Sequence, residues 1–135
     1  MKTCTLGEVE AAVNSLLSGY QEELNLYLVV RNLTMAQKEL LTPQHAAVGI
    51  AAGLTQRADF MRFTDLLDEK EDILRIIGQI ESEMKPSKSL VMSQEPETCP
   101  RRWTLATLLD RVADTIDEIR VMERDNVSRL QEIPA

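Results

Sequence analysis

The chain has 135 residues, 44% of them hydrophobic and 27% charged, which is the size and composition of one folded domain with a charged surface. Its formal net charge of −7 argues against binding to DNA, RNA or anionic membranes, because such partners attract clustered lysine and arginine. No apolar run approaches the roughly 18 residues of a membrane span, so we expect no membrane insertion. The first residues turn polar and acidic by Glu8, so we expect no signal peptide. Cys4 and Cys99 are isolated thiols, a usage that favours a reduced cytoplasmic chain but leaves a disulfide between them open.

The first predicted helix covers residues 6–41. Thr5 and Glu8 have the spacing of a capping box, in which the Thr5 hydroxyl accepts the amide of Glu8 and Glu8 reaches back. Apolar residues then recur on one helical face: Leu6, Val9, Val13, Leu16, Tyr20, Leu24, and Tyr27 or Leu28. Thr42 and Pro43 end this helix, because a residue before proline disfavours helical geometry while proline suits the first position of a new helix. So short a junction predicts an antiparallel hairpin.

The second predicted helix covers residues 43–84, and its most regular part is residues 59–84. Its apolar side carries Phe60, Phe63, Leu67, Leu74, Ile77 and Met84, widened by Leu66, Ile73, Ile76 and Ile80. The charged run from Asp65 to Asp72 is interpreted as a solvated face. Gly49 and Gly53 have a GxxxG spacing, which indicates close approach of two backbones near the hairpin tip or a helix break at Gly53.

A linker is predicted over residues 85–103. Pro86, Pro96 and Pro100 alternate there with serines, which argues against a long helix. Residues 90–92 are its one apolar stretch, interpreted as docking on the bundle or on a partner. The segment is long enough for a third helix to return along the hairpin in either direction.

The third predicted helix covers residues 104–131, with Thr104 as N-cap and Trp103 folded onto Leu108 as a hydrophobic staple. A seam with a period of about 3.5 runs along it, as in helices that lie against other helices. Alternating steps of four and three residues connect its positions: Leu105, Leu109, Val112, Ile116, Ile119, Glu123, Asn126 and Leu130. The seam is apolar up to Ile119 and then contains both polar and apolar residues, which suits reversible contact with a partner. The same pattern is also explained if this is simply the last helix of a small bundle.

The predicted fold is therefore all-α: one domain over residues 1–135, built as a long antiparallel helical hairpin plus a third C-terminal helix in a coiled-coil-like bundle. No catalytic or metal-binding pattern accompanies it. His45 is the only histidine, and the chain lacks a P-loop, a GxGxxG and a GxSxG motif. Asp110, Asp114 and Asp117 lie along one helical face and could suggest a cation site. They lie opposite the seam, in water, where no pocket surrounds them, so we expect no such site. We expect no cofactor, no metal and no enzymatic activity.

The pattern resembles the FlgN-type flagellar export chaperones in three stretches. The first runs from Tyr20 to Tyr27, followed by Leu33 and residues 37–41. The second runs from Leu66 to Leu74 and on to Ile77, Ile80 and Glu81, similar to the family's leucine pair, lysine and further apolar pair. The third is the closing set Ile119, Met122, Asn126 and Leu130. Residues 42–57 depart from the family pattern, since they are longer and richer in alanine and glycine than its usual connection.

This resemblance implies a cytoplasmic, non-enzymatic chaperone that holds hook–filament junction proteins before export through the flagellar type III apparatus. Family members bind the disordered terminal helices of these clients, largely through their own C-terminal helix. The client-binding residues it implies here are Leu105, Leu109, Val112, Ile116, Ile119, Met122, Asn126 and Leu130. Such binding would be helix-in-groove recognition, in which the client becomes ordered as it binds.

Two other classes of protein remain open. One is a structural coiled-coil subunit that buries the same seam in a homodimer, with Asn126 setting the register. The other is a chaperone or adaptor of a different secretion system. The oligomeric state distinguishes the first alternative from the chaperone, and genomic neighbours distinguish the second.

Overall fold

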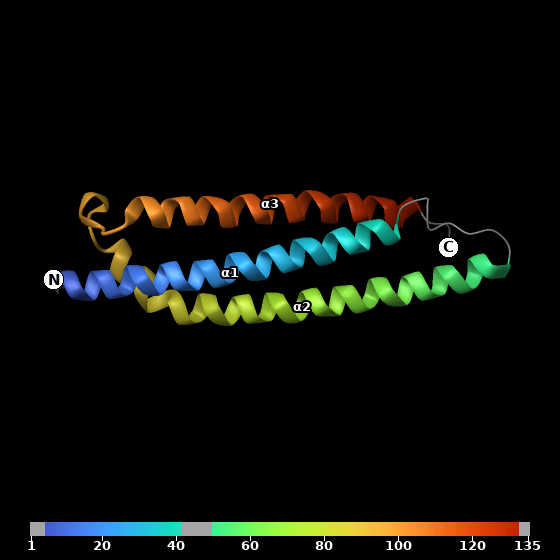
Figure 1. Ribbon diagram of the computed structural model, residues 1–135, viewed down its shortest axis with the longest axis horizontal. Coiled ribbons are helices and arrows are strands. Elements are labelled where there is room, and N and C mark those ends of the chain that lie inside the picture. Colours follow the sequence, from blue (N-terminus) through green and yellow to red (C-terminus); the bar gives the residue numbers. More distant parts are fainter. Residues whose placement is uncertain (1–4, 42–49, 133–135) are drawn as a thin grey trace.

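The computed structural model describes residues 5–41 and 50–132, with side chains at 5–41 and 57–132. Those residues form three long helices and no strand: α1 (Leu6–Leu40), α2 (Ile50–Met92) and α3 (Arg102–Glu132), with the 3-10 helix η2 (Pro96–Thr98) before α3. The predicted all-α three-helix bundle is therefore confirmed. Figure 1 shows α1 and α3 running in the same direction and α2 in the opposite one, which settles the direction of the third helix that the sequence left open.

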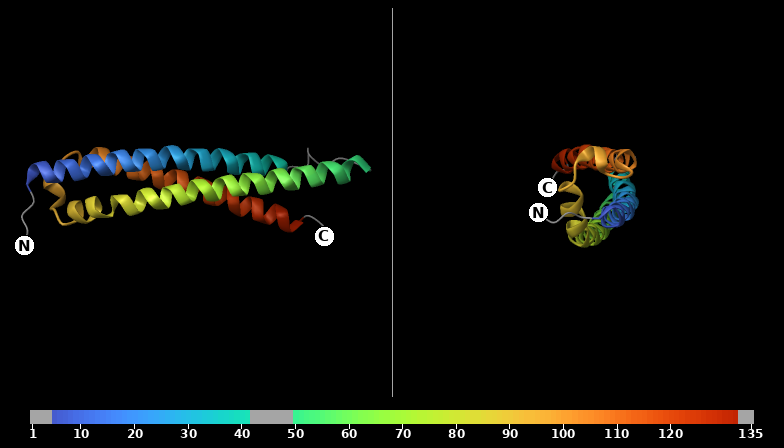
Figure 2. Two further views of the ribbon diagram at one scale, coloured as in Figure 1. Left: turned by 90° about the horizontal axis from the view of Figure 1, so that it is seen from below. Right: turned by 90° about the vertical axis from the view of Figure 1, so that its left-hand side faces the viewer.

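The first helix lies between the other two. Its predicted N-cap is confirmed, since the Thr5 hydroxyl accepts a 3.1 Å hydrogen bond from the amide of Glu8. Both α2 and α3 pack along α1, but among the described residues they make few direct contacts with each other. The end view in Figure 2 accordingly shows the three helix axes as an arc with α1 in its middle. The last turns of α2 cross the gap between α2 and α3 at the end where α1 begins (Figure 2), and beyond them this side of α1 is covered by no helix of the described chain.

The apolar core lies toward the end of the bundle where α1 begins and α2 ends. It contains residues from all three helices: Leu16, Tyr20, Leu24, Ile80, Met84, Leu105, Leu108 and Val112. Full burial of side chains of this size contributes about 1.5–3 kcal/mol each. Gly19 lets α1 and α2 approach closely here, because a β-carbon at this position would collide with the thioether of Met84.

The second helix extends further than predicted. Its described part begins at Ile50, runs unbroken through Gly53 and continues past Pro86 to Met92, so the linker predicted over residues 85–103 is wrong for its first part, residues 85–92. Proline removes one helical hydrogen bond, but contacts on its far side hold the last turns in place. Lys88 forms an ion pair with Glu81 across the proline, and Val91 packs against the apolar core. Figure 1 shows α2 bending in this stretch. The predicted start of this helix at Pro43 lies outside the described residues.

The third helix begins two residues earlier than predicted. The carbonyl of Arg101 already accepts the amide of Leu105 at 3.0 Å, so Thr104 lies inside α3 and is not its N-cap. Arg101 itself has a φ of 55°, a left-handed conformation that turns the chain into the helix. The predicted staple is also wrong, because Trp103 is 74% exposed and its ring lies against the guanidinium of Arg102 instead of against Leu108.

Candidate functional site

The residues of the predicted seam of α3 fall into two groups in the structure. One group forms a buried strip, and the other lies beside that strip and is partly exposed. Leu105, Val112, Ile119 and Asn126 are buried, as expected for positions that face another helix. The positions that alternate with them are Leu108 and Thr115, in place of the predicted Leu109 and Ile116. A heptad seam contains two residue sets: the set at 105, 112, 119 and 126 is buried, while Ile116 of the other set is half-buried and packs against the apolar core.

The other seam positions lie beside this buried strip. Leu109 is 38% exposed, while Ile116, Met122, Glu123 and Leu130 are half-buried. Residues seven apart share one face of a helix, since two turns take up about 7.2 residues. Leu109, Ile116 and Glu123 therefore form one strip, and the 3.1 Å ion pair between Glu123 and Lys70 shows that this strip faces α2.

A matching strip runs along α2. Leu67, Leu74, Glu81 and Lys88 also succeed one another at intervals of seven residues. Leu67 and Leu74 are 40% and 45% exposed, next to the buried Leu66 and the half-buried Ile73 that face the bundle.

Contacts made by the charged members of this strip give its orientation. Lys88 lies over the ring of Tyr20, with its Nζ 5.4 Å from the ring centroid. Tyr27 lies two helical turns after Tyr20 on α1 and is half-buried. The charges of Glu81 on α2 and Arg120 on α3 both influence its pKa, so both helices face it. The strip on α2 therefore faces the same side of α1 as the strip on α3.

We call this surface the open side and define it by Tyr27, Leu67, Leu74, Leu109 and Ile116. Its side chains are aliphatic on α2 and α3 and a tyrosine on α1, and all five are at least partly exposed. Burial raises the pKa of Tyr27 above 10, and the carboxylates of Glu23 and Glu81 add to this while Arg120 opposes it. The Tyr27 hydroxyl is therefore a neutral hydrogen-bonding group at physiological pH.

A polar junction, formed by Thr34, Gln37, Lys70, Glu123 and Asn126, bounds the open side toward the C-terminal end of α3. The buried Nζ of Lys70 lies 2.6 Å from Gln37 Oε1, 3.4 Å from Thr34 Oγ1 and 3.1 Å from Glu123 Oε1. Asn126 donates to the carbonyl of Thr34 at 3.3 Å, while its buried Oδ1 has no partner among the described residues. Polar contacts thus join all three helices here, whereas at the other end of the bundle the helices are joined by the apolar core.

A carboxylate pair, Glu23 of α1 and Glu81 of α2, lies beside Tyr27 at the end of the open side away from the polar junction. Burial and the hydrogen bond with Glu81 raise the pKa of Glu23 from 4.5 to about 8. Although burial opposes it, hydrogen bonds with Lys88 and Glu23 lower the pKa of Glu81. The same contact with Glu81 raises the pKa of Lys88. At neutral pH the pair therefore shares one proton, carried by Glu23, and the Glu81 carboxylate pairs with Lys88.

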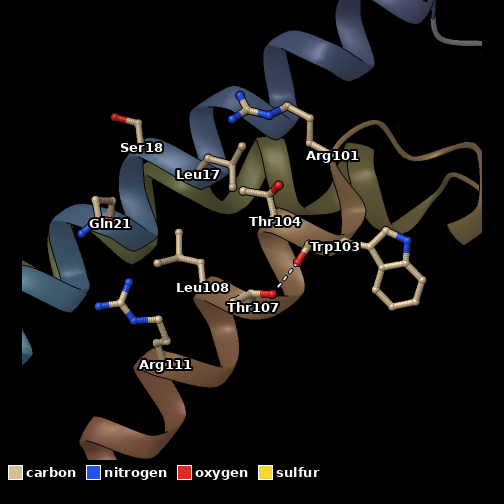
Figure 3. Close-up of a pocket in the computed structure, with 9 residues that line it drawn as sticks. All are labelled: Leu17, Ser18, Gln21, Arg101, Trp103, Thr104, Thr107, Leu108 and Arg111. Atoms are coloured by element: carbon tan, nitrogen blue, oxygen red, sulfur yellow. Dashed lines mark hydrogen bonds between the residues drawn. The ribbon is translucent and has the colours of Figure 1, made fainter.

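A depression of about 670 Å³ lies on the opposite flank of α3 from the open side. Figure 3 shows Arg101 and Arg111 toward its two ends, with Leu17 and Leu108 between them and Trp103 turned outward. Thr107 in its wall donates to the carbonyl of Trp103 at 2.8 Å, which holds the first turn of α3. No carboxylate lines this depression among the residues that the structure describes.

Sequence reasoning missed two buried ionisable residues. Lys70 lies in the charged run interpreted as a solvated face, and that interpretation is wrong for this residue, which is buried. Glu23 is also buried in the α1–α2 interface. A signal was available, because Lys70 lies four residues after Leu66, and Glu23 lies three after Tyr20, at core spacing in each helix. A polar residue at a core position can mark a buried polar contact, and need not mean that the helix face has left the core.

Within residues 5–41 and 57–132, no three potential ligand side chains gather in a way that could hold a metal ion. His45 and Cys4 lie outside the described residues, and Cys99 is half-buried. None of the helices in the described part of the chain is long and apolar enough to cross a membrane. Comparison of the chain with protein-family models, curated proteins and solved structures finds no match.

Proposed function

We propose that this protein is a cytoplasmic, non-enzymatic export chaperone that binds the terminal helices of hook–filament junction proteins and keeps them unassembled before flagellar type III secretion. The observation that carries the proposal is the open side. An apolar strip on α2 and another on α3 flank the same side of α1, and Leu74 and Leu109 remain 45% and 38% exposed there. The resemblance to FlgN-type chaperones supplies the identity of the client.

The site we propose differs from the seam predicted on α3 alone. Val112 and Ile119 are committed to the bundle, so an incoming helix would instead contact Leu109 and Ile116 on α3 and Leu67 and Leu74 on α2. A client helix with an apolar face would complete a four-helix arrangement, which is recognition of an amphipathic helix in a groove. The net charge of −7 keeps the exposed apolar side from associating with other acidic molecules.

The test measures binding of a synthetic peptide from the terminal helix of a hook–filament junction protein by titration calorimetry. Leu74→Asp and Leu109→Asp each place a charge on the open side without entering the buried strip. Since an unpaired charge in an apolar contact costs several kcal/mol, and about 1.4 kcal/mol corresponds to tenfold in affinity, each substitution should weaken binding by more than about tenfold.

Val121→Asp is the matched control. Val121 is 55% exposed and lies two residues from the buried Ile119, so it points away from α1. This variant should bind like the parent, and thermal melts should show all three variants folded. Unchanged affinity in both open-side variants would exclude this surface. A parent protein that binds no junction-protein helix, while forming a stable dimer that Leu74→Asp dissociates, would favour the structural coiled-coil subunit.

A further inference from the structure

The depression at the start of α3 combines an apolar floor with two arginines. Leu17 of α1 and Leu108 of α3 line it, and Arg101 and Arg111 lie toward its ends (Figure 3). Its volume of about 670 Å³ accommodates a few side chains and not a folded domain. The side chains of Thr104 and Thr107 add hydroxyl groups to the wall between the two arginines.

The positive charge of this depression is not neutralised by an ion pair within the part of the chain that the structure describes. Arg101 donates at 3.1 Å to Asn14, a neutral acceptor, and neither Arg101 nor Arg111 forms an ion pair within the described residues. The first turn of α3 contains no acidic residue, so the positive end of the helix dipole adds to the same field. In a chain of net charge −7, this is a local reversal of sign.

The chemistry of the depression specifies its ligand. Guanidinium groups recognise carboxylates through paired, charge-assisted hydrogen bonds, and the leucine floor favours an aliphatic neighbour. A long polyanion such as RNA would meet the acidic remainder of the surface, whereas a short segment would meet only the arginines.

We propose that this depression binds a short acidic segment of a partner protein, whose carboxylates pair with Arg101 and Arg111 while an aliphatic side chain lies on Leu17 and Leu108. It lies on the flank of α3 opposite the open side and does not depend on the function proposed for that side. The two surfaces could be occupied at once.

Trp103, the only tryptophan of the chain, lies at the rim and reports binding by its fluorescence. The probe is an acetylated hexapeptide of alternating leucine and glutamate, titrated into the full chain, and the comparison is the same peptide with glutamine for glutamate. We expect saturable binding of the acidic peptide, weakening as salt is added, and binding of the glutamine peptide that is weaker by about tenfold or more.

Arg111→Gln should lower the affinity for the acidic peptide by about fivefold to tenfold. Arg124→Gln, which removes the same charge from an exposed position on the opposite face of α3, should leave binding unchanged. The Nε–Hε resonances of Arg101 and Arg111 in the unaltered protein provide a readout that needs no variant, and both should shift with the acidic peptide. Equal binding of the two peptides, equal affinity in Arg111→Gln, unshifted arginine resonances, or tighter binding of an oligonucleotide of the same charge would each overturn the proposal.

Discussion

At the scale of single residues, the bundle buries Lys70 and Glu23 in two different ways, and the Oε1 atom of Glu23 has no hydrogen-bond partner among the described residues. The Nζ of Lys70 is held by three oxygen atoms, two on α1 and one on α3. Glu23 instead retains its proton, because burial and the neighbouring Glu81 raise its pKa to about 8. A buried carboxyl group that is protonated can donate a hydrogen bond, and this avoids most of the desolvation that an anion would suffer. The consequence is that stability depends on pH through Glu23.

Glu23 should make the fold less stable as pH rises from 5 to 9. Its folded-state pKa of about 8 exceeds the ordinary 4.5, so the folded state holds a proton that the unfolded state releases. That contribution is complete below about pH 4.5 and is lost as pH rises through 8. The pKa values of Glu81, Lys88 and Tyr27 are shifted away from this range, so they do not titrate within it.

The measurement is urea unfolding of the parent and of Glu23→Gln across this pH range. Glutamine keeps the volume and still donates a hydrogen bond to Glu81, so its free energy of unfolding should vary less with pH than that of the parent. The variant should be the more stable protein at pH 9. Glu22→Gln, at an exposed neighbouring position, serves as the control and should follow the parent. Parallel pH profiles for the parent and Glu23→Gln would contradict this account.

At the scale of elements, α3 is held differently along its two halves. Leu105, Leu108 and Val112 belong to the apolar core near its N-terminal end. Toward its C-terminal end the buried contacts are polar, through Asn126 and the pairing of Glu123 with Lys70. Polar contacts gain little net stability relative to water, and Asn126 leaves a buried oxygen without a partner among the described residues. The second half of α3 is therefore expected to separate from the bundle more easily.

Native-state hydrogen exchange followed by mass spectrometry tests this difference. Amides from about residue 105 to 118 should exchange only on global unfolding, while those from about 120 to 132 should exchange through a local opening of lower free energy. Asn126→Leu should slow exchange in the second half by removing the unpaired oxygen, without changing the first. Uniform protection along α3 would show that the polar junction holds the helix as firmly as the apolar core does.

The features of each helix that depend on local spacing could be predicted from the sequence, and those that depend on contacts with another helix could not. Local spacing predicted three helices from their apolar faces, the Thr5 cap from its capping-box pattern and four of the seam positions from the period of about 3.5. The end of α2 was not predictable from Pro86, since the contacts that carry the helix past the proline, Lys88 and Val91, involve residues on α1 and in the core. The choice of Leu108 over Leu109 likewise depends on where α1 lies, which spacing within α3 cannot specify.

At the scale of the whole molecule, the central position of α1 accounts for both candidate surfaces. In a closed three-helix bundle every pair of helices would touch, whereas here α2 and α3 each pack along α1 and hardly contact each other. This arrangement leaves the open side between them and places the arginine-lined depression on the other flank of α3. The two surfaces differ in chemistry, one aliphatic and one cationic, so each selects a different feature of a partner.

The last prediction concerns stoichiometry. If the open side accepts a client helix, the free chain should be a monomer by light scattering over a wide range of concentration, and the complex with a junction-protein terminal peptide should contain one copy of each. Because the peptide binds only the folded state, free peptide at a hundred times its Kd should stabilise the fold by about 2.7 kcal/mol. The melting temperature should therefore rise with peptide concentration in the parent and in Val121→Asp, and by about half as much or less in Leu109→Asp, whose binding is weaker by more than about tenfold. A dimer that persists on dilution and melts independently of peptide would mean that a second copy of this chain covers the aliphatic strips of α2 and α3, since two such chains could bury Leu74 and Leu109 against each other as well as against a client.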